Sequence, residues 1–159
     1  MVTIRTAVPD DWRLVRDVRL RALADAPDAF GITLAESETY PEEAWRSRLA
    51  SSSPTLLALD EGRPVAMGGG FLLPQSDAAM VWGMWTEPAA RGRGLGHRIL
   101  EAVVAWALHA GRTPYLHVTE GNEIARAVYV AFGFEPTGEW TPLREGSSLR
   151  IEEMVLRRG

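Results

Sequence analysis

Cysteine and lysine are both absent from the 159 residues of the chain. Without cysteine there is no disulfide, no thiolate metal site and no cysteine nucleophile. Without lysine, all 17 basic residues are arginine, and mechanisms that require a lysine, such as a Walker-type phosphate loop or Schiff-base catalysis, are excluded. The three histidines, His97, His109 and His117, do not have the spacing of metal ligands, so no metal site is predicted.

Long apolar runs are also lacking, and the charge balance is acidic. No segment approaches the ~20 apolar residues of a membrane span, and residues 1–12 lack the apolar core of a signal peptide. The net charge of −4 argues against non-specific binding to nucleic acid, which requires a basic face. We therefore expect a cytoplasmic protein that binds neither membranes nor nucleic acid. The length predicts a single domain, residues 1–159, that forms a core without disulfides.

The apolar pattern predicts an α+β fold with the element order β-α-α-β-β-β-α-β-α-β. The expected strands are residues 2–8, 55–60, 64–73, 79–86, 113–119 and 148–156. The expected helices are residues 11–24, 41–50, 95–108 and 122–132, with helical fragments in the loop 25–39. Asp10 or Asp11 is expected to cap the first helix, and Thr39 with Glu42 the second. The arginines of the first helix are expected on its solvated side.

Residues 86–100, with the sequence TEPAARGRGLGHRIL, place three glycines and three arginines at the start of the helix expected at 95–108. A helix N-terminus presents unpaired N–H groups and the positive end of its dipole, which favour a bound phosphate. Glycines let the backbone approach the anion, and Arg91, Arg93 and Arg98 add positive charge. The spacing is not the G-x-G-x-x-G of dinucleotide-binding folds, because the third glycine comes one residue early. The stretch therefore predicts a phosphate site of another kind.

The spacing fits R-x-x-G-x-G, with Arg91, Gly94 and Gly96 at the fixed positions, and the lead-in WTEP at residues 85–88 precedes it. One strand later, a segment of the form N-x-x-A-x-x-x-Y-x-x-x-G-F is filled by Asn122, Ala125, Tyr129, Gly133 and Phe134. With both motifs in this order, the chain resembles the GCN5-related N-acetyltransferase (GNAT) superfamily over nearly its whole length. The resemblance implies a mixed central sheet with splayed strands 4 and 5, flanked by about four helices.

The resemblance also implies a reaction and its co-substrate. Acetyl-CoA is expected to donate an acetyl group, without a metal, to a primary amine in a ternary complex, and the acceptor to be a small molecule or a peptide. The loop would grip the pyrophosphate, and a bulge in the fourth strand, placed at Trp85 and Thr86, would offer an N–H to the thioester carbonyl. Homodimerisation through the last strand is common in such domains. The expected cofactor-binding residues are Trp85, Thr86, Arg91, Gly92, Arg93, Gly94, Leu95, Gly96, His97 and Asn122.

Tyr129 and His117 are the expected catalytic residues. A tyrosine hydroxyl, with a pKa of about 10, can protonate the departing thiolate, and the matching motif gives Tyr129 this role. His117 lies in the strand expected at 113–119, where ribosomal-protein and N-terminal-peptide acetyltransferases of the superfamily commonly place a glutamate base. An imidazole can accept the proton of the amine through a water molecule instead. Glu120, Glu87 and bulk water are the alternative proton acceptors.

The sequence does not specify the acceptor. The loop 25–39 lies where the family builds its acceptor wall, so Glu36 and Glu38 are candidates to hold a cation there, and Trp82 is a candidate for an aromatic wall. Three other functions stay open at this point. They are a non-catalytic sensor of acyl-CoA, the same fold with a longer acyl-CoA or an O-linked acceptor, and a nucleotide-binding module of another fold.

Overall fold

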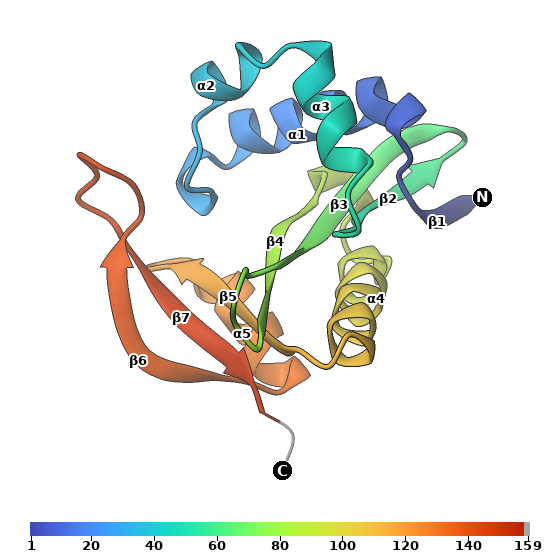
Figure 1. Cartoon of the computed structure of the whole chain (residues 1–159). Helices are drawn as coiled ribbons and strands as arrows, with labels where there is room; N and C mark the ends of the chain where they lie inside the picture. The colour runs from blue at the N-terminus through green and yellow to red at the C-terminus, as the bar shows by residue number, and fades with distance from the viewer. Residues whose placement is uncertain (158–159) are drawn as a thin grey trace.

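A computed structural model describes residues 1–157 and shows a seven-stranded sheet with the order β1-β2-β3-β4-β5-β7-β6 (Figure 1). The strands are β1 (Val2–Thr6), β2 (Thr55–Asp60), β3 (Arg63–Leu72), β4 (Ala78–Thr86), β5 (Thr113–Thr119), β6 (Phe134–Pro142) and β7 (Arg150–Leu156). The helices are α1 (Trp12–Asp25), α2 (Leu34–Glu38), α3 (Glu42–Leu49), α4 (Leu95–His109) and α5 (Glu123–Phe132). All neighbouring strands are antiparallel except β4 and β5, which run parallel. Within residues 1–157, no helix combines the length and apolarity needed to cross a membrane.

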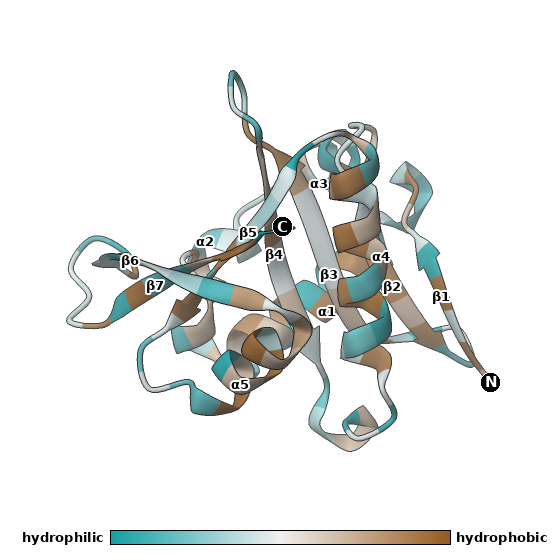
Figure 2. Ribbon diagram, turned by 90° about the horizontal axis from the view of Figure 1, so that it is seen from below, coloured by the Kyte–Doolittle hydropathy of each residue, from teal (hydrophilic) through white to brown (hydrophobic). Residues whose placement is uncertain are grey.

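Two apolar cores hold the helices against opposite faces of the sheet. Figure 1 shows α1 and α3 on one side and α4 on the other. In Figure 2, α4 lies along β3, with hydrophobic and hydrophilic segments alternating around it. Its buried stripe consists of Leu95, Ile99, Leu100, Val103, Val104 and Ala107. On the other face, α1 and α3 pack onto β2, β3 and β4 through a cluster that includes Val18, Leu23, Trp45, Leu57, Met67 and Trp85. The helix predicted at residues 95–108 is therefore confirmed.

The predicted elements are present within a few residues of their expected bounds, but the structure adds one strand. β6 runs along the edge of the sheet beside β7. Pro136 and Pro142 conceal it in the sequence, because proline lacks the N–H of a strand ladder and is tolerated in sheets mainly at edges. A register shift between Pro136 and Trp140 accommodates the irregular part of this strand. The α+β class is confirmed, with seven strands in place of six.

Two predicted helix caps are not present. The carboxylate of Asp11 accepts a hydrogen bond from the N–H of Val8, at 2.8 Å, and does not cap α1. α3 begins after Pro41 without a side-chain cap. The hydroxyl of Thr39 instead donates to the backbone oxygen of Glu36 in α2, at 2.6 Å. In both cases a local turn competes successfully for the side chain that was expected to cap the next helix.

Candidate active site

β4 and β5 lie side by side only at their beginnings. Their backbone pairing is limited to Ala78, Ala79 and Met80 of β4, opposite residues 113–115 of β5. Beyond these pairs the strands separate (Figure 1), which confirms the splay that the resemblance implied. Past Met80, β4 and β5 therefore form no backbone hydrogen bonds with each other. Residues of both strands line a common cavity there.

A β-bulge distorts β4 at the start of this opening. The register between β3 and β4 shifts there, so that Gly83 and Met84 together oppose Gly68. Gly83 has a φ of 67°, in the left-handed region that glycine adopts without strain. The bulge that the resemblance implied at Trp85 and Thr86 therefore lies two residues earlier. The difference has a conformational reason, since a side chain other than glycine is strained at a positive φ.

The backbone of Thr86 faces the open side of β4. The N–H of Glu87 donates to the carbonyl of Val65 in β3, at 2.8 Å. Because backbone groups alternate along a strand, the N–H and C=O of Thr86 point away from β3. Its carbonyl accepts a hydrogen bond from Nε of Arg91, at 3.0 Å. A backbone N–H at this edge is the type of donor that can polarise a carbonyl oxygen in the opening.

The loop before α4 presents an uncapped helix N-terminus. Gly92 and Gly94 have φ values of 83° and 75°, and a Cβ at either position would meet nothing within 4 Å. Gly94 is the N-cap residue, and no side chain accepts a hydrogen bond from the first N–H groups of the helix, which follow at Leu95 and Gly96. These N–H groups stand at the positive end of the helix dipole, directly after the two glycines that border open space. The arrangement fits a diphosphate group.

Acidic side chains hold the two arginines of this loop. Nη2 of Arg91 lies 3.3 Å from the carboxylate of Asp25, which also accepts the indole N–H of Trp85 at 3.0 Å. Arg93 pairs with Asp60 at 3.1 Å. Both guanidinium groups are thus engaged with carboxylates. The backbone N–H groups are therefore more available to an anion than these arginines are. Through Asp25, Arg91 ties the loop to α1 and Trp85 ties β4 to α1.

His97 and Asn122 each have local partners. The ring of His97 lies 5.6 Å from that of Phe132, and its Nε2 is 2.7 Å from the carboxylate of Glu101. Oδ1 of Asn122 accepts a hydrogen bond from the N–H of Ala125, at 3.3 Å, and so caps α5. Contact of either residue with the cofactor stays a prediction.

Tyr129 lies on α5 and is partly buried against the core that α4 shares with the sheet. Its ring packs edge-on against Phe134, with the centroids 6.0 Å apart. Burial raises the pKa of Tyr129 to about 12, so the hydroxyl keeps its proton at neutral pH. A protonated hydroxyl is the form that a general acid requires.

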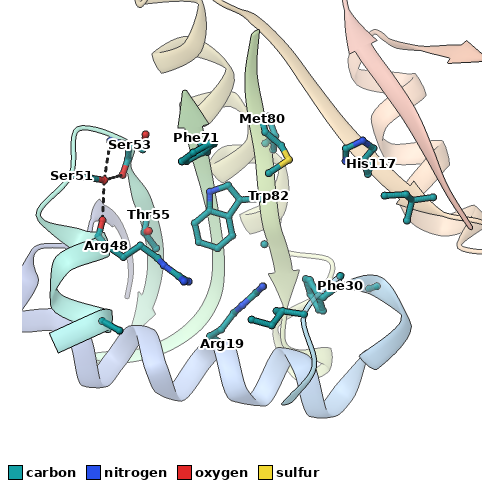
Figure 3. A pocket seen from close by; sticks show the side chains of 18 of the residues that line it. Arg19, Phe30, Arg48, Ser51, Ser53, Thr55, Phe71, Met80, Trp82 and His117 are labelled. Atoms are coloured by element: carbon teal, nitrogen blue, oxygen red, sulfur yellow. Dashed lines mark hydrogen bonds between the residues drawn. The ribbon is translucent and has the colours of Figure 1, made fainter. Parts of the chain in front are cut away.

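His117 lines the cavity from β5 (Figure 3). Its side chain is 31% exposed, its ring stands edge-on to Tyr115, and its Nε2 lies 3.9 Å from the carboxylate of Glu153. Burial lowers the pKa of His117, and the charge of Glu153 offsets part of this effect. The imidazole is therefore neutral at neutral pH, the form that accepts a proton. Among residues 1–157, no group of acidic and histidine side chains is arranged to hold a metal ion.

The two alternative glutamate bases are tied to arginines. Glu120 accepts hydrogen bonds from the backbone N–H and the guanidinium of Arg150, at 2.8 and 3.3 Å, and these bonds lower the pKa of its carboxyl group. Glu87 lies between Arg21, at 2.7 Å, and Arg63, at 2.8 Å. Neither carboxylate is among the residues that line the cavity. Both are therefore less suited than the histidine to accept a proton there.

The cavity has a volume of about 850 Å³ and lies on the α1–α3 side of the sheet (Figure 3). Its apolar lining includes Phe30, Ile32, Phe71, Met80, Trp82 and Ile151. Trp82 thus forms part of an aromatic wall. Glu36 and Glu38, which were candidates to hold a cation here, are exposed on α2 and are not among the lining residues. Glu36 instead accepts a hydrogen bond from the hydroxyl of Thr33 at the start of that helix.

Three consecutive glycines of β3, which were not predicted as site residues, make room for large side chains on both faces of the sheet. A Cβ on Gly69 would lie 2.6 Å from the indole of Trp82, and one on Gly68 would lie 2.7 Å from a methyl group of Ile99 in α4. The run MGGGF is itself a signal, since glycine weakens a strand and marks a close approach of other atoms.

Gly69→Ala is expected to raise the KM for the acceptor without weakening the binding of acetyl-CoA. An added methyl group in a packed site costs about 1–3 kcal/mol, and the open cavity lets the Trp82 ring relieve the contact by moving into it. Initial rates, calorimetry with acetyl-CoA and thermal unfolding are the measurements. An unchanged acceptor KM in a folded variant would show that the Trp82 wall does not contact the acceptor.

The sequence matches the family model described as acetyltransferase (GNAT) family over residues 20–134. A comparison with proteins of curated function gave no significant match. A GNAT-family acetyltransferase from Streptococcus pneumoniae shares 20% identity, with 98% of each chain covered and a TM-score of 0.78. YncA from Salmonella typhimurium, whose structure contains its cofactor acetyl-CoA, shares 17% identity, with 100% of this chain and 96% of that chain covered and a TM-score of 0.76. PaiA N-acetyltransferase from Thermoplasma acidophilum, in complex with coenzyme A, shares 16% identity, with 96% of this chain and 98% of that chain covered and a TM-score of 0.75.

The structural likenesses show a shared fold, and the family model adds a match in sequence. That match includes the glycine loop and both splayed strands, and it extends through α5 to Phe134. Together with the uncapped N-terminus of α4, these findings show that the chain belongs to the acetyltransferase (GNAT) family.

Proposed function

We propose that this protein transfers the acetyl group of acetyl-CoA directly to a primary amine in a ternary complex. The observation that carries the proposal is the position of His117, which lines a large cavity at the opening between β4 and β5. The uncapped N-terminus of α4 comes after the end of β4 in the chain, and α4 lies on the face of the sheet opposite α1 and α3 (Figure 1). The acetyl-CoA and coenzyme A in two structures of the same fold support a CoA thioester as the donor.

The donor site is assigned to the loop and to β4. Backbone N–H groups of residues 94–97 would hold the pyrophosphate. Gly92 allows the positive φ that the loop requires, and Arg91 and Arg93 lie on either side of it. Acetyl-CoA supplies an acetyl thioester. The N–H of Thr86 is assigned to its carbonyl oxygen, since this group faces the opening.

Two side chains are assigned to proton transfer. An ammonium group cannot attack a carbonyl, so neutral His117 accepts its proton, either directly or through a water molecule. Tyr129 donates its hydroxyl proton to the sulfur that leaves the acetyl group. The chain contains no cysteine, which excludes a route through an acetyl-cysteine.

A panel of amine acceptors tests the proposal, with release of the CoA thiol as the signal. Because the protein has no cysteine, a thiol reagent reports only the CoA that is released. Calorimetry first establishes that the protein binds acetyl-CoA, and a reaction without acceptor measures hydrolysis. Thiol release that depends on the amine is expected. Tight binding without release for any acceptor would identify a sensor of acyl-CoA, and faster release from longer acyl thioesters would identify a different donor.

His117→Gln is expected to remove one limb of the pH profile. The pKa of His117 is lowered by burial, so kcat/KM of the wild type should rise with pH through a limb below the ordinary histidine pKa of about 6.5. Glutamine keeps most of the volume but does not titrate in this range. The variant should therefore lose the limb and approach the wild-type rate only at high pH, where free amine is abundant. An unchanged profile would leave bulk water or a glutamate as the proton acceptor.

A cytoplasmic location and a homodimer are further parts of the proposal. The last strand, β7, is paired with β5 on one side and β6 on the other, so pairing of two copies through its own edge is not possible. The exposed edge strand beside it, β6, is the surface at which two copies can pair. Cell fractionation tests the location, and light scattering coupled to gel filtration tests the dimer.

A further inference from the structure

Arg19 is a buried cation without a hydrogen-bond partner at one of its nitrogens. It lies on α1 and is 8% exposed. Among residues 1–157, its Nη1 is the one buried side-chain nitrogen or oxygen that has no hydrogen-bond partner. The first helix was expected to turn its arginines to solvent, and Arg19 departs from that expectation. A buried donor that lacks an acceptor lowers stability. Such a group in a folded protein therefore points to a role.

The surroundings position this guanidinium but do not neutralise it. It lies over the ring of Phe30, at 4.8 Å, and over that of Trp82, at 5.5 Å. Arg48 reaches toward the same space from α3 (Figure 3), and no acidic residue is found among the residues that line the cavity. Burial, with a further contribution from Arg48, lowers the pKa of Arg19 to about 10, so it is still charged at neutral pH. The cavity thus carries positive charge without a counter-ion.

The guanidinium also stands beside the bulge of β4. A Cβ on Gly83 would lie 3.4 Å from Nη1 of Arg19. Gly83 borders the opening between β4 and β5, and His117 lines the same cavity from the other strand. An anion bound at Arg19 would therefore lie next to the place where the acceptor amine must react.

We propose that the acceptor is a free α-amino acid and that Arg19 binds its carboxylate. This inference rests on the proposed function, since it assigns the substrate class of the same site. A guanidinium can hold a carboxylate through two parallel hydrogen bonds, which satisfies the unpaired nitrogen. In an α-amino acid one carbon separates carboxylate and amine, which matches an anion site directly beside the opening. The apolar and aromatic lining favours an uncharged side chain, and the two arginines disfavour polyamines.

The first test is a matched panel of acceptors. Phenylalanine and leucine are compared with their carboxamides, with 2-phenylethylamine and 3-methylbutylamine, which lack the carboxyl group, and with spermidine. We expect kcat/KM for each amino acid to exceed that for its amide and its amine by about 30-fold or more, as for loss of a buried charge pair. An amine beside a carboxamide has a lower pKa than one beside a carboxylate, so a larger fraction of it is unprotonated and able to attack. Amine protonation alone would therefore favour the amide over the amino acid. Equal or better use of the amides, amines or spermidine would overturn the proposal.

The second test removes the charge. Arg19→Met keeps an unbranched apolar chain and should reduce the preference for the amino acid over its amide to within about threefold, with the affinity for acetyl-CoA unchanged. Arg46→Met is the matched control, since Arg46 lies on α3 and pairs with Glu42 and Asp10 outside the cavity. The control should keep the full preference. A preference that survives in Arg19→Met would overturn the assignment.

A binding experiment separates this inference from the proposed function. If the protein binds acetyl-CoA but transfers to no amine, the proposed function fails, and calorimetry with N-acetylphenylalanine and its amide then decides the carboxylate site alone. Binding of the acid and not of the amide, lost in Arg19→Met, would support the site. Equal binding of both compounds, or no binding of either, would overturn it.

Discussion

Gly94→Asp and Gly96→Asp are each expected to reduce the affinity for acetyl-CoA by about 100-fold or more, because a hydrogen bond to a charged group contributes about 1.5–3 kcal/mol and at least two are lost. At either position the new carboxylate occupies the end of α4 where the N–H groups are uncapped, and it repels a phosphate. Gly96→Asp also places its Cβ 3.4 Å from the hydroxyl of Thr86. Calorimetry with acetyl-CoA measures the loss.

Stability and affinity should change independently in these variants. An aspartate in the first turn of a helix interacts favourably with the dipole, by about 0.3–1 kcal/mol, so Gly96→Asp should not lower the melting temperature. Gly94→Asp adds a left-handed residue, at a cost of about 1–2 kcal/mol. Gly111→Asp, with a φ of 72° and open space around it after the last turn of α4, is the matched control for both charge and strain. Unchanged affinity in folded Gly94→Asp and Gly96→Asp would disprove the loop assignment.

Tyr129→Phe is expected to lower kcat by about 10²- to 10⁴-fold, the usual effect of losing a general acid. The substitution keeps the edge-on packing against Phe134 and removes only the hydroxyl group. Folding and acetyl-CoA affinity should therefore persist. Steady-state kinetics together with calorimetry separates the rate effect from a binding effect.

Tyr115→Phe is the control for Tyr129→Phe. Burial raises the pKa of this second tyrosine as well, and its ring lies edge-on to His117. It should retain kcat, since no proton transfer is assigned to it. Because the pKa of Tyr129 is about 12, the acid stays protonated and kcat of the wild type should not decline up to about pH 10. Wild-type kcat in Tyr129→Phe would return this residue to a purely structural role.

Features that depend on local residue spacing could be predicted from the sequence. The phosphate loop was predicted because a helix start and glycine conformations are set by adjacent residues, and Gly92 and Gly94 do adopt positive φ. Strands β2–β5 and helix α4 were predicted because period-two and helical apolar patterns need only one buried face. The two motifs also sufficed to indicate the family, since each fixes residue types at several positions.

Contacts between side chains of different elements depend on the tertiary structure. The bulge lies at Gly83 because the register between β3 and β4 shifts there. β6 can form a strand despite its prolines because it lies at the edge of the sheet beside β7, where proline is tolerated. Arg19 stands four residues after Val15 and three before Ala22, so the helical repeat puts it on the buried face. Residue spacing is therefore sufficient to place Arg19 on the buried face of α1. Its unpaired guanidinium in an aromatic cavity without carboxylates results from packing against α3, β4 and the loop before α2, which residue spacing along one helix does not encode.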